Sequence, residues 1–201
     1  MTVAPTRLPA AERRQHLIET AIRLFSEGSY RGTTTAEIAR AAGVSEPILY
    51  RHFASKRGLY LAALDHVWQQ ARTAWEYCLT SAGDIRSGFD EMGRGHYAVR
   101  ESKIKLAELW VQALSEAGED PELRKHLRRH MREVHEYLAD VIRRGQAEGV
   151  LHADRDPEAE AWIFMAGGFL GMVGRRVGLV DDDDVARIRA ARREWLRAPT
   201  A

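Results

Sequence analysis

The sequence predicts an all-α fold for this chain of 201 residues. Apolar residues recur at helical spacing along most of its length, as Leu17, Ala21 and Leu24 do near the start. Gly, Pro and Asp residues separate these stretches in the manner of helix ends. No stretch of the sequence alternates apolar and polar residues as a half-buried strand does. We therefore expect helices throughout.

The first three predicted helices are separated by two short interruptions. Thr34 and Glu37 form a T-x-x-E capping box, which predicts the start of the second helix. Gly43 suits the positive φ that ends a helix, and Ser45 is a good N-cap for the third. Pro47 falls in the first turn of that helix, where its missing N–H is harmless. The predicted helices cover approximately residues 10–26, 34–42 and 45–53.

The rest of the chain also carries helix punctuation. Ser55 is expected to cap a long helix, and the pairs Asp120-Pro121 and Asp156-Pro157 each place an N-cap before a proline at the first helical position. The further helices are expected approximately from Ser55 to residue 80, over 85–99, 103–114 and 121–148, from 157 past 173, and from within 181–184 to 197.

Charge is unevenly distributed along the chain, although its formal net charge is only +1. The first 60 residues carry nine Lys or Arg against five Glu, a net charge of +4. The remainder carries 21 basic against 24 acidic residues, a net charge of −3. A basic amino-terminal region followed by a mildly acidic remainder indicates that the amino-terminal region binds a polyanion.

The single cysteine, Cys78, excludes an internal disulfide and fits a reducing compartment. The first ten residues lack the apolar core of a signal peptide. The longest uncharged apolar run, over residues 161–174, is shorter than the roughly 20 residues that a membrane-spanning helix needs. We therefore expect a cytoplasmic protein with no membrane partner.

The stretch from Thr33 to Lys56 resembles the helix-turn-helix of the TetR family of bacterial transcriptional regulators. The resemblance covers ERRQHLIETAIRLFSEGSYRGTTTAEIARAAGVSEPILYRHFASKRGLY and is carried by Gly43-Val44-Ser45, Leu49-Tyr50, His52-Phe53 and Ser55-Lys56. It implies a DNA-binding domain over residues 1–56 and a larger helical domain over 57–201 that binds an effector and dimerises. Such proteins are typically homodimeric repressors that a small molecule releases from a palindromic operator in double-stranded DNA.

The resemblance also implies two kinds of DNA contact. The residues at positions that usually grip phosphates are Thr35, Tyr50, His52 and Lys56. Those at positions that usually face base edges are Glu46, Pro47 and Ile48. A glutamate carboxylate accepts from a cytosine amino group, and an isoleucine side chain contacts a thymine methyl. The full predicted set of DNA-binding residues is Thr34, Thr35, Ser45, Glu46, Pro47, Ile48, Tyr50, Arg51, His52 and Lys56.

Several glycines interrupt the apolar helix after Asp156. Each glycine in a helix interior costs roughly 1 kcal/mol relative to alanine, and close approach of a neighbouring backbone would offset that cost. In the resembled family the last two helices of two subunits form a four-helix bundle, so we expect the dimer contact there. The alternative is that both helices pack only within their own domain. The predicted interface residues are Trp162, Gly167, Phe169, Leu170, Gly171, Val173, Gly174, Val185, Ile188 and Trp195.

The middle of the chain is rich in aromatic and Met residues of the kind that line pockets between helices. His96, Tyr97 and Lys103 are the candidate polar anchors for an apolar or amphipathic effector, and no cofactor is expected. The alternative is that these residues form only the core. The candidate lining residues are Trp75, Phe89, Met92, His96, Tyr97, Lys103, Trp110, Tyr137, Phe164 and Met165.

Two other clusters of residues could bind a metal ion, but a simpler role explains each of them better. His126 and His130 are four residues apart on a helix, a spacing that can serve one metal ion. The surrounding Arg and Lys residues favour a solvated basic face instead. The acidic run Asp181–Asp184 more simply caps the final helix.

The sequence carries no Gly-rich phosphate loop, metal-ligand signature or nucleophile elbow, so we do not expect an enzyme. A helical scaffold for protein interactions is the alternative function. That alternative leaves the basic cluster of Tyr50, Arg51, His52 and Lys56 without a role.

Overall fold

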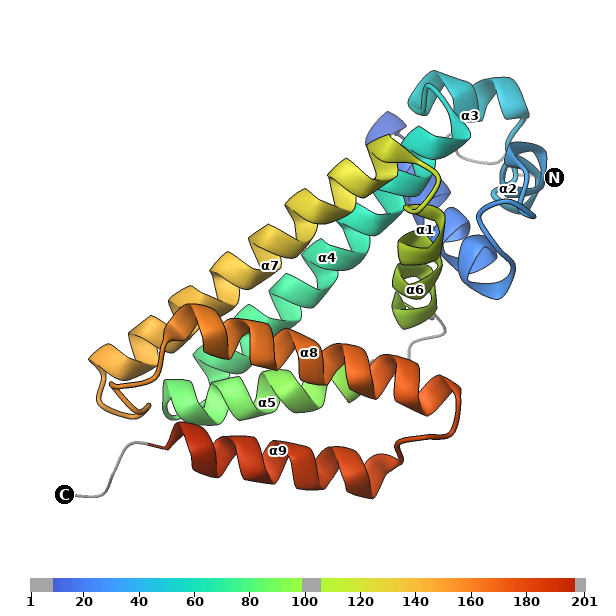
Figure 1. Cartoon of the computed structure of the whole chain (residues 1–201). Helices are drawn as coiled ribbons and strands as arrows, with labels where there is room; N and C mark the ends of the chain where they lie inside the picture. Colours follow the sequence, from blue (N-terminus) through green and yellow to red (C-terminus); the bar gives the residue numbers. More distant parts are fainter. Residues whose placement is uncertain (1–8, 99–105, 198–201) are drawn as a thin grey trace, which may run out of the picture. The chain divides into compact units, whose positions relative to one another are not determined.

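The structure, a computed structural model, describes residues 9–98 and 106–197 as helices joined by short connections (Figure 1). Within these residues, the only pairing of extended backbone is an isolated bridge between Leu151 and Arg197, so the predicted all-α class is confirmed. None of the described helices is long and apolar enough to cross a membrane. The helices are α1 (Ala10–Glu27), α2 (Thr35–Ala41), α3 (Glu46–His52), α4 (Lys56–Ser81), α5 (Ile85–Ala98), α6 (Leu106–Glu116), α7 (Pro121–Ala147), α8 (Pro157–Arg176) and α9 (Asp182–Leu196).

The chain divides into two compact units. The first unit comprises Met1–Gln69 and Ser102–Leu123, and the second unit comprises Gln70–Glu101 and Arg124–Ala201. The first unit is larger than the predicted domain of residues 1–56, because it also includes the beginning of α4 and all of α6. Helices α4 and α7 each contribute residues to both units.

A cluster of three aromatic rings packs together in the first unit. The ring of Tyr60, on α4, lies 4.9 Å from that of Phe25 on α1 and 4.6 Å from that of Tyr30 in the following loop. Tyr60 is fully buried, and its hydroxyl donates to the backbone carbonyl of Leu109 on α6 at 3.2 Å. A buried hydroxyl needs such a partner. This hydrogen bond links α4 to α6 within the first unit.

Polar contacts from α6 and the residues after it hold the loop that precedes α2. The Arg31 guanidinium pairs with Glu116 at 2.9 Å and also with Glu119. The Gln112 side chain donates to the carbonyl of Gly28 at 3.0 Å. Exposed ion pairs contribute little free energy individually, so their main effect here is to position the loop.

In the second unit, α8 and α9 begin as the sequence predicts. The Asp156 carboxylate accepts the backbone N–H of Glu158 at 3.0 Å, and Pro157 occupies the first helical position. Asp181 and Asp184 form a reciprocal capping box, with hydrogen bonds of 2.8 Å and 3.2 Å. The capping role predicted for the acidic run is therefore confirmed.

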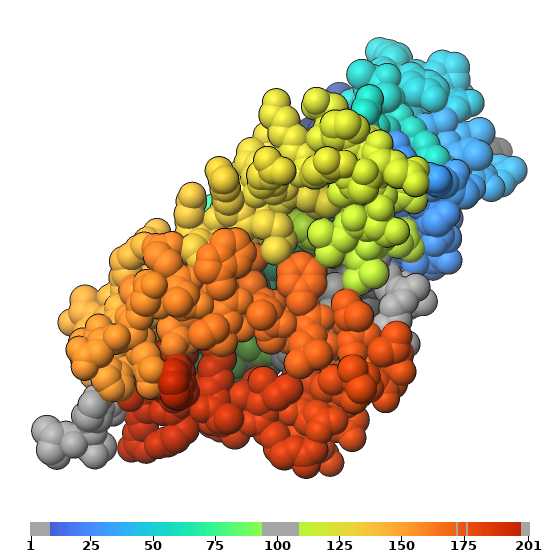
Figure 2. Space-filling model, viewed as in Figure 1, coloured from blue at the N-terminus to red at the C-terminus, as the bar shows by residue number. Residues whose placement is uncertain are grey.

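The α8 and α9 helices carry apolar residues on both their inner and outer sides. Ala161, Met165, Val185 and Leu196 are buried in the unit. Figure 2 shows the atoms of α8 and α9, in orange and red, adjoining at the molecular surface. The large apolar residues that remain exposed on these helices and the turn between them are Trp162, Ile163, Leu170, Val173, Val177, Leu179, Ile188 and Trp195.

Candidate nucleic-acid interface

The start of α2 is fixed by the predicted capping box. The Thr34 hydroxyl accepts the backbone N–H of Glu37 at 3.2 Å, and the Glu37 carboxylate accepts the backbone N–H of Thr34 at 2.8 Å. The Thr34 hydroxyl also donates to this carboxylate at 2.9 Å, and the two bonds that Thr34 donates lower the pKa of the Glu37 carboxyl. Ile38 and Ala39 are buried, so the opposite side of α2 faces outward.

A tight turn at Gly43 connects α2 to α3. Gly43 has a φ of +67°, in the left-handed region that L side chains rarely adopt. The turn is closed by hydrogen bonds from Gly43 N–H to the Arg40 carbonyl at 3.1 Å and from Val44 N–H to the Ala39 carbonyl at 2.9 Å. The glycine predicted to end α2 is therefore required by the backbone.

Helix α3 begins at Ser45 in a different way from that predicted. Ser45 is the N-cap residue, but its side chain accepts no capping hydrogen bond. Its backbone carbonyl instead accepts from Ile48 N–H at 2.9 Å and Leu49 N–H at 3.2 Å. Leu49 and Phe53, four residues apart, are buried together, and this orients the other faces of α3 outward.

Three predicted DNA-binding residues form a hydrogen-bonded cluster across the two helices. The Thr35 hydroxyl on α2 donates to the Glu46 carboxylate on α3 at 2.5 Å. The Tyr50 hydroxyl lies 3.1 Å from the same Thr35 oxygen. Thr35 is only 8% exposed, whereas Tyr50 is 47% exposed. The cluster therefore holds Glu46 and Tyr50 in fixed positions at the surface.

The remaining predicted residues lie at or near the surface of the same segment. Ile48 and His52 are half-buried, as is Glu46. Those that are exposed are Thr34, Ser45, Pro47 and Arg51. Hydroxyl, carboxylate, apolar, aromatic and cationic groups are thus presented together by two short helices, a combination that can contact both phosphates and base edges.

Lys56 is the first residue of α4, as predicted. Its ammonium donates to the Arg31 carbonyl at 3.3 Å and lies 4.7 Å from the centre of the Tyr30 ring. Burial lowers the pKa of this ammonium, and the negative charges of Glu116 and Glu37 act in the opposite direction. The contact of Tyr30 with Lys56 was not predicted from sequence, because nothing local links the two residues.

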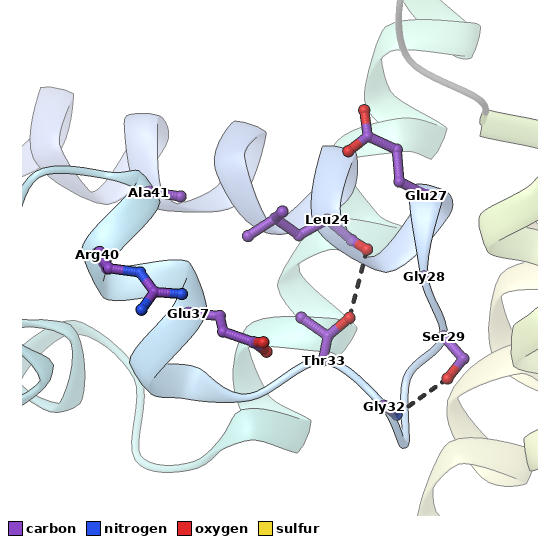
Figure 3. Close-up of a pocket in the computed structure, with 9 residues that line it drawn as sticks. All are labelled: Leu24, Glu27, Gly28, Ser29, Gly32, Thr33, Glu37, Arg40 and Ala41. Carbon is purple, nitrogen blue, oxygen red and sulfur yellow. Dashed lines mark hydrogen bonds between the residues drawn. The ribbon is translucent and has the colours of Figure 1, made fainter.

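A cavity of about 600 Å³ lies between the end of α1, the loop after it and α2 (Figure 3). The Thr33 hydroxyl donates to the Leu24 carbonyl at 3.3 Å, and Gly32 N–H donates to the Ser29 hydroxyl at 2.9 Å. Glu27, Glu37 and Arg40 supply the charged part of the lining, shown in Figure 3. None of the predicted effector-binding residues lines this cavity.

Four of the predicted effector-binding residues form one aromatic cluster in the second unit. Trp75 stacks on Tyr137 and meets Phe164 edge-on, both at 6.0 Å between ring centroids. Phe164 lies 4.9 Å from Phe89. These rings come from α4, α5, α7 and α8, so tertiary packing brings together residues that are far apart in sequence.

The other predicted effector-binding residues are not joined to this cluster by the described contacts. Met92 and Met165 are buried in the second unit. Trp110 belongs to the first unit and is half-buried. His96 and Tyr97 lie within α5, but their side chains, like the whole of Lys103, lie outside the described part of the structure.

The predicted dimer residues fall into three groups by their exposure. Val185, Gly171 and Gly174 are buried within their own unit. A Cβ atom added to Gly174 would come within 2.6 Å of the Val180 side chain, so the backbone that closely approaches this glycine belongs to the same chain. This contact within the chain gives one reason for a glycine at position 174, and the partner contact at Gly174 stays a prediction. Gly167 and Phe169 are half-buried, and the exposed members are Trp162, Leu170, Val173, Ile188 and Trp195.

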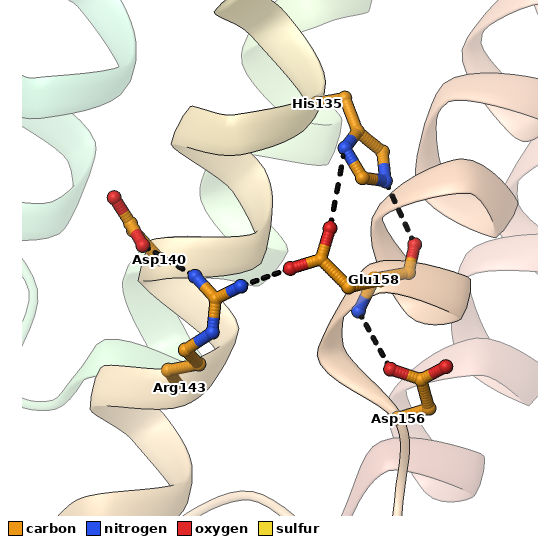
Figure 4. Close-up of polar contacts among 5 residues, drawn as sticks. All are labelled: His135, Asp140, Arg143, Asp156 and Glu158. Atoms are coloured by element: carbon orange, nitrogen blue, oxygen red, sulfur yellow. Dashed lines mark hydrogen bonds and ion pairs between the residues drawn. The ribbon is translucent and has the colours of Figure 1, made fainter. Parts of the chain in front are cut away.

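The exposed Trp162 packs against a buried histidine, His135. Its indole stacks on the His135 ring on α7, with 4.1 Å between centroids. His135 Nε2 lies 2.9 Å from the backbone carbonyl of Glu158, and its Nδ1 lies 3.5 Å from the Glu158 carboxylate (Figure 4). Arg143 pairs with that carboxylate and with Asp140, so the beginning of α8 is tied to α7.

His126 and His130 differ from their predicted place on a solvated basic face. Both are buried, with 7% and 2% of their surface exposed, and their rings lie 5.8 Å apart. They share the inner side of α7 with the buried Leu123, three residues before His126, and Leu127, three residues before His130. The cations around them are exposed on the other side of α7, and these are Arg124, Lys125, Arg128, Arg129 and Arg132.

Two family models match the chain. The model of bacterial regulatory proteins of the tetR family matches residues 17–63, which contain the helix-turn-helix described above. The model of the carboxy-terminal domain of BetI-type transcriptional repressors matches residues 98–198, half of the chain.

Individual relatives are regulators of the same kind. The transcriptional activator FasR of Mycolicibacterium smegmatis is 50% identical over 58 residues, which cover 29% of this chain and 26% of FasR. The regulator AcrR of Shigella flexneri is 39% identical over 64 residues, 32% of this chain and 28% of AcrR. The regulator BetI of Burkholderia mallei is 27% identical over 127 residues, 63% of this chain and 65% of BetI. Each match spans less than two thirds of the relative's length.

Solved structures share the fold. A TetR-family regulator from Rhodococcus sp. superposes with a TM-score of 0.84 at 22% identity, covering 94% of this chain and 100% of the other. A regulator from Saccharomonospora viridis in complex with choline has a TM-score of 0.76 at 23% identity and covers 92% and 95%. With its capped α2, its glycine turn, its exposed α3 and these two family matches, the chain belongs to the TetR family of bacterial transcriptional regulators.

Proposed function

We propose that this regulator is a homodimeric repressor that binds a palindromic operator and is released by a small apolar or amphipathic molecule. The observation that carries the proposal is the cluster of Thr35, Glu46 and Tyr50, which fixes polar groups on the exposed side of the helix-turn-helix. The name of the matching carboxy-terminal model, a BetI-type repressor, supports repression. Since the bacterial chromosome lies in the cytoplasm, we place the protein there.

In this proposal α3 enters the major groove. Tyr50, His52 and Lys56 contact phosphates and set the register, while Glu46 and Ile48 read base edges. Pro47 stiffens the first turn of α3 and is exposed, so it adds an apolar contact without a backbone donor. Phosphate contacts supply most of the affinity and make it dependent on salt.

The dimer of this proposal forms through the exposed apolar residues of α8 and α9. A contiguous exposed apolar surface on a water-soluble protein usually marks an interaction site. A two-fold symmetric contact uses the same surface on both subunits, which suits a pair of helices that each carry such residues. Dimerisation is also what gives two α3 helices a fixed separation, as a palindromic site requires.

The effector of this proposal binds in the second unit, near the aromatic cluster of Trp75, Phe89, Tyr137 and Phe164. Rings of this kind line most small-molecule sites. The complex of the Saccharomonospora viridis regulator with choline supports a small-molecule effector for this chain as well. Because α4 contributes to both units, a ligand-induced shift of α4 offers a route to the DNA-binding helices. The ligand acts by binding more tightly to the state with lower operator affinity.

The proposal is tested by selecting duplexes from a randomised pool with the purified full-length protein. We expect enrichment of two-fold symmetric sequences, with binding that weakens steeply as salt is raised. Enrichment of no sequence, together with binding that salt does not affect, would favour the scaffold function. Enriched sites without symmetry would contradict the dimeric mode of reading.

A further inference from the structure

An arginine side chain lies against the aromatic cluster of the second unit. The guanidinium carbon of Arg192, on α9, is 4.8 Å from the centre of the Phe89 ring and 4.6 Å from that of the Phe164 ring. The two rings are themselves 4.9 Å apart, and Trp75 meets Phe164 edge-on. A cation from α9 therefore occupies the ring faces that α5 and α8 provide.

Arg192 remains positively charged at neutral pH in these surroundings. Burial lowers the pKa of its guanidinium to about 10, while Glu160 and Asp90 act in the opposite direction. The contacts described for these two carboxylates are to other residues. Glu160 accepts the indole N–H of Trp195 at 2.8 Å, and Asp90 lies 3.5 Å from Arg193.

Two nitrogen atoms of Arg192 have no hydrogen-bond acceptor in residues 9–98 and 106–197. These are Nε and Nη2, and both are buried. A planar guanidinium offers two pairs of parallel N–H groups to a carboxylate, Nε with Nη2 and Nη1 with Nη2. Aromatic faces attract the cation but do not replace these directional bonds. A buried charged donor without an acceptor is costly, and Arg192 has two such atoms.

We propose that Arg192 binds the carboxylate of a small organic anion, with both carboxylate oxygens at the guanidinium edge formed by Nε and Nη2. The proposal rests on the ligand-responsive function above and names the chemical class of its effector. The apolar part of the ligand packs beside Phe89 and Phe164. Because Nη2 is buried, the side chains over this edge must move apart to admit the carboxylate. Ligand binding drives that movement through its higher affinity for the opened state.

The same arrangement discriminates by charge. A cationic ligand of equal size is repelled by the guanidinium at short range, and a neutral one forms no charge-assisted hydrogen bonds. Benzoate, benzamide and benzamidinium have nearly the same shape and differ in charge, so they separate this effect from simple apolar packing.

The test is calorimetric titration of the full chain, without DNA, with each of the three compounds. We expect benzoate to bind at least about tenfold more tightly than benzamide, the factor that one hydrogen bond to a charged group supplies, and benzamidinium to bind least. Equal affinity for benzoate and benzamide, or no benzoate binding up to its solubility limit, would overturn the proposal.

Two arginine variants locate the site. Arg192→Met keeps an unbranched apolar stem and removes the guanidinium, whereas Arg193→Met changes the exposed neighbour on α9. We expect Arg192→Met to lose the rise in Tm that benzoate gives the wild-type protein, and Arg193→Met to keep it.

A measurement on the unmodified protein covers the case in which Arg192→Met does not fold. With arginine labelled at Nε, the resonance of a buried Arg192 N–H should shift on adding benzoate and not on adding benzamide. An unchanged spectrum would overturn the proposal. The selection of two-fold symmetric duplexes is a separate measurement of DNA binding. Binding to DNA without binding to benzoate therefore rejects only the anion site. Benzoate binding without any effect on operator occupancy rejects only the proposed release.

Discussion

The hydroxyl of Thr35 joins the two helices of the helix-turn-helix. The family resemblance implies a phosphate contact for this residue, and the structure adds a bond to the Glu46 carboxylate and a contact with the Tyr50 hydroxyl. A carboxylate held in one position loses less conformational freedom when it meets a base edge. Thr35 therefore acts, in the proposed function, by positioning Glu46.

Replacing Thr35 by valine keeps the shape of the side chain and removes the donor. We expect operator affinity to fall about tenfold, since a hydrogen bond to a charged group is worth roughly 1.5–3 kcal/mol, and the base preference opposite Glu46 to relax. Fluorescence anisotropy titration and randomised-site selection measure the two effects. Thr35→Ser is the control and should retain both properties. Equal losses in the two variants would assign the effect to packing rather than to the hydroxyl.

The Glu37 carboxylate makes the start of α2 sensitive to acid. Its pKa is lowered from the ordinary value of 4.5 because it accepts hydrogen bonds from Thr34. A group with a lowered pKa in the folded state stabilises the protein above its unfolded pKa and loses that contribution as pH falls through the folded value. The capping box should therefore be fully effective at neutral pH.

Comparing wild type with Glu37→Ala in urea unfolding at several pH values checks this effect. We expect wild type to be more stable at pH 7, and the difference to shrink steadily once the pH is below about 4.5. Glu12→Ala, which removes an exposed first-turn glutamate from α1, serves as the control. A difference between wild type and Glu37→Ala that is independent of pH would show that the carboxylate charge plays no part.

At the scale of elements, the turn between α2 and α3 depends on one backbone conformation. Gly43 has a φ of +67°, and a Cβ added there would meet no atom within 4 Å. The cost of an alanine at this position is therefore backbone strain alone. Gly149, which follows α7, is the matched case, with a φ of +71° and equally open surroundings.

Gly43→Ala and Gly149→Ala should each lower the free energy of unfolding by about 1 kcal/mol, the cost of a left-handed residue with a Cβ atom. Only Gly43→Ala should also weaken operator binding, because only this turn sets the angle between α2 and α3. Urea unfolding and anisotropy titration give the two quantities. Operator binding weakened equally by both variants would contradict a specific role for the Gly43 turn.

Local sequence signals predicted the helix ends well, but they did not predict which side of α7 is buried. Capping boxes and Asp-Pro pairs act within one turn, so Thr34, Asp156 and Asp181 marked helix starts correctly. The many cations around His126 and His130 suggested a solvated face. Their spacing from Leu123 and Leu127 puts both histidines on the buried side, and apolar periodicity, given more weight than charge, would have revealed it.

At the scale of the whole molecule, the exposed apolar residues of α8 and α9 are the surface on which the proposed dimer depends. Leu170 and Val173, on α8, are 44% and 45% exposed, and Ile188, on α9, is 42% exposed. Apolar side chains of this size are stabilised when an identical surface covers them.

Leu170→Glu should convert the proposed dimer into a monomer, because two carboxylates would be brought from water into an apolar contact. Light scattering coupled to size-exclusion chromatography measures the mass, and anisotropy titration should show weaker operator binding in the same variant. Tyr77→Glu alters an apolar residue on α4 that is 71% exposed, and it is the control expected to leave both unchanged. A wild-type protein that is already monomeric, or a dimeric Leu170→Glu variant, would contradict this use of the surface.

The sequence by itself determined the all-α class, the helix starts and the helix-turn-helix, because caps, glycine turns and apolar periodicity act over a few residues. Only the tertiary structure decided that α6 belongs with the helix-turn-helix, that Thr35 holds Glu46, and that Arg192 lies between Phe89 and Phe164. These arrangements join residues that lie 11 to 103 positions apart in the chain. No local pattern encodes such contacts, because they form when buried surfaces and buried charges find their lowest free energy together.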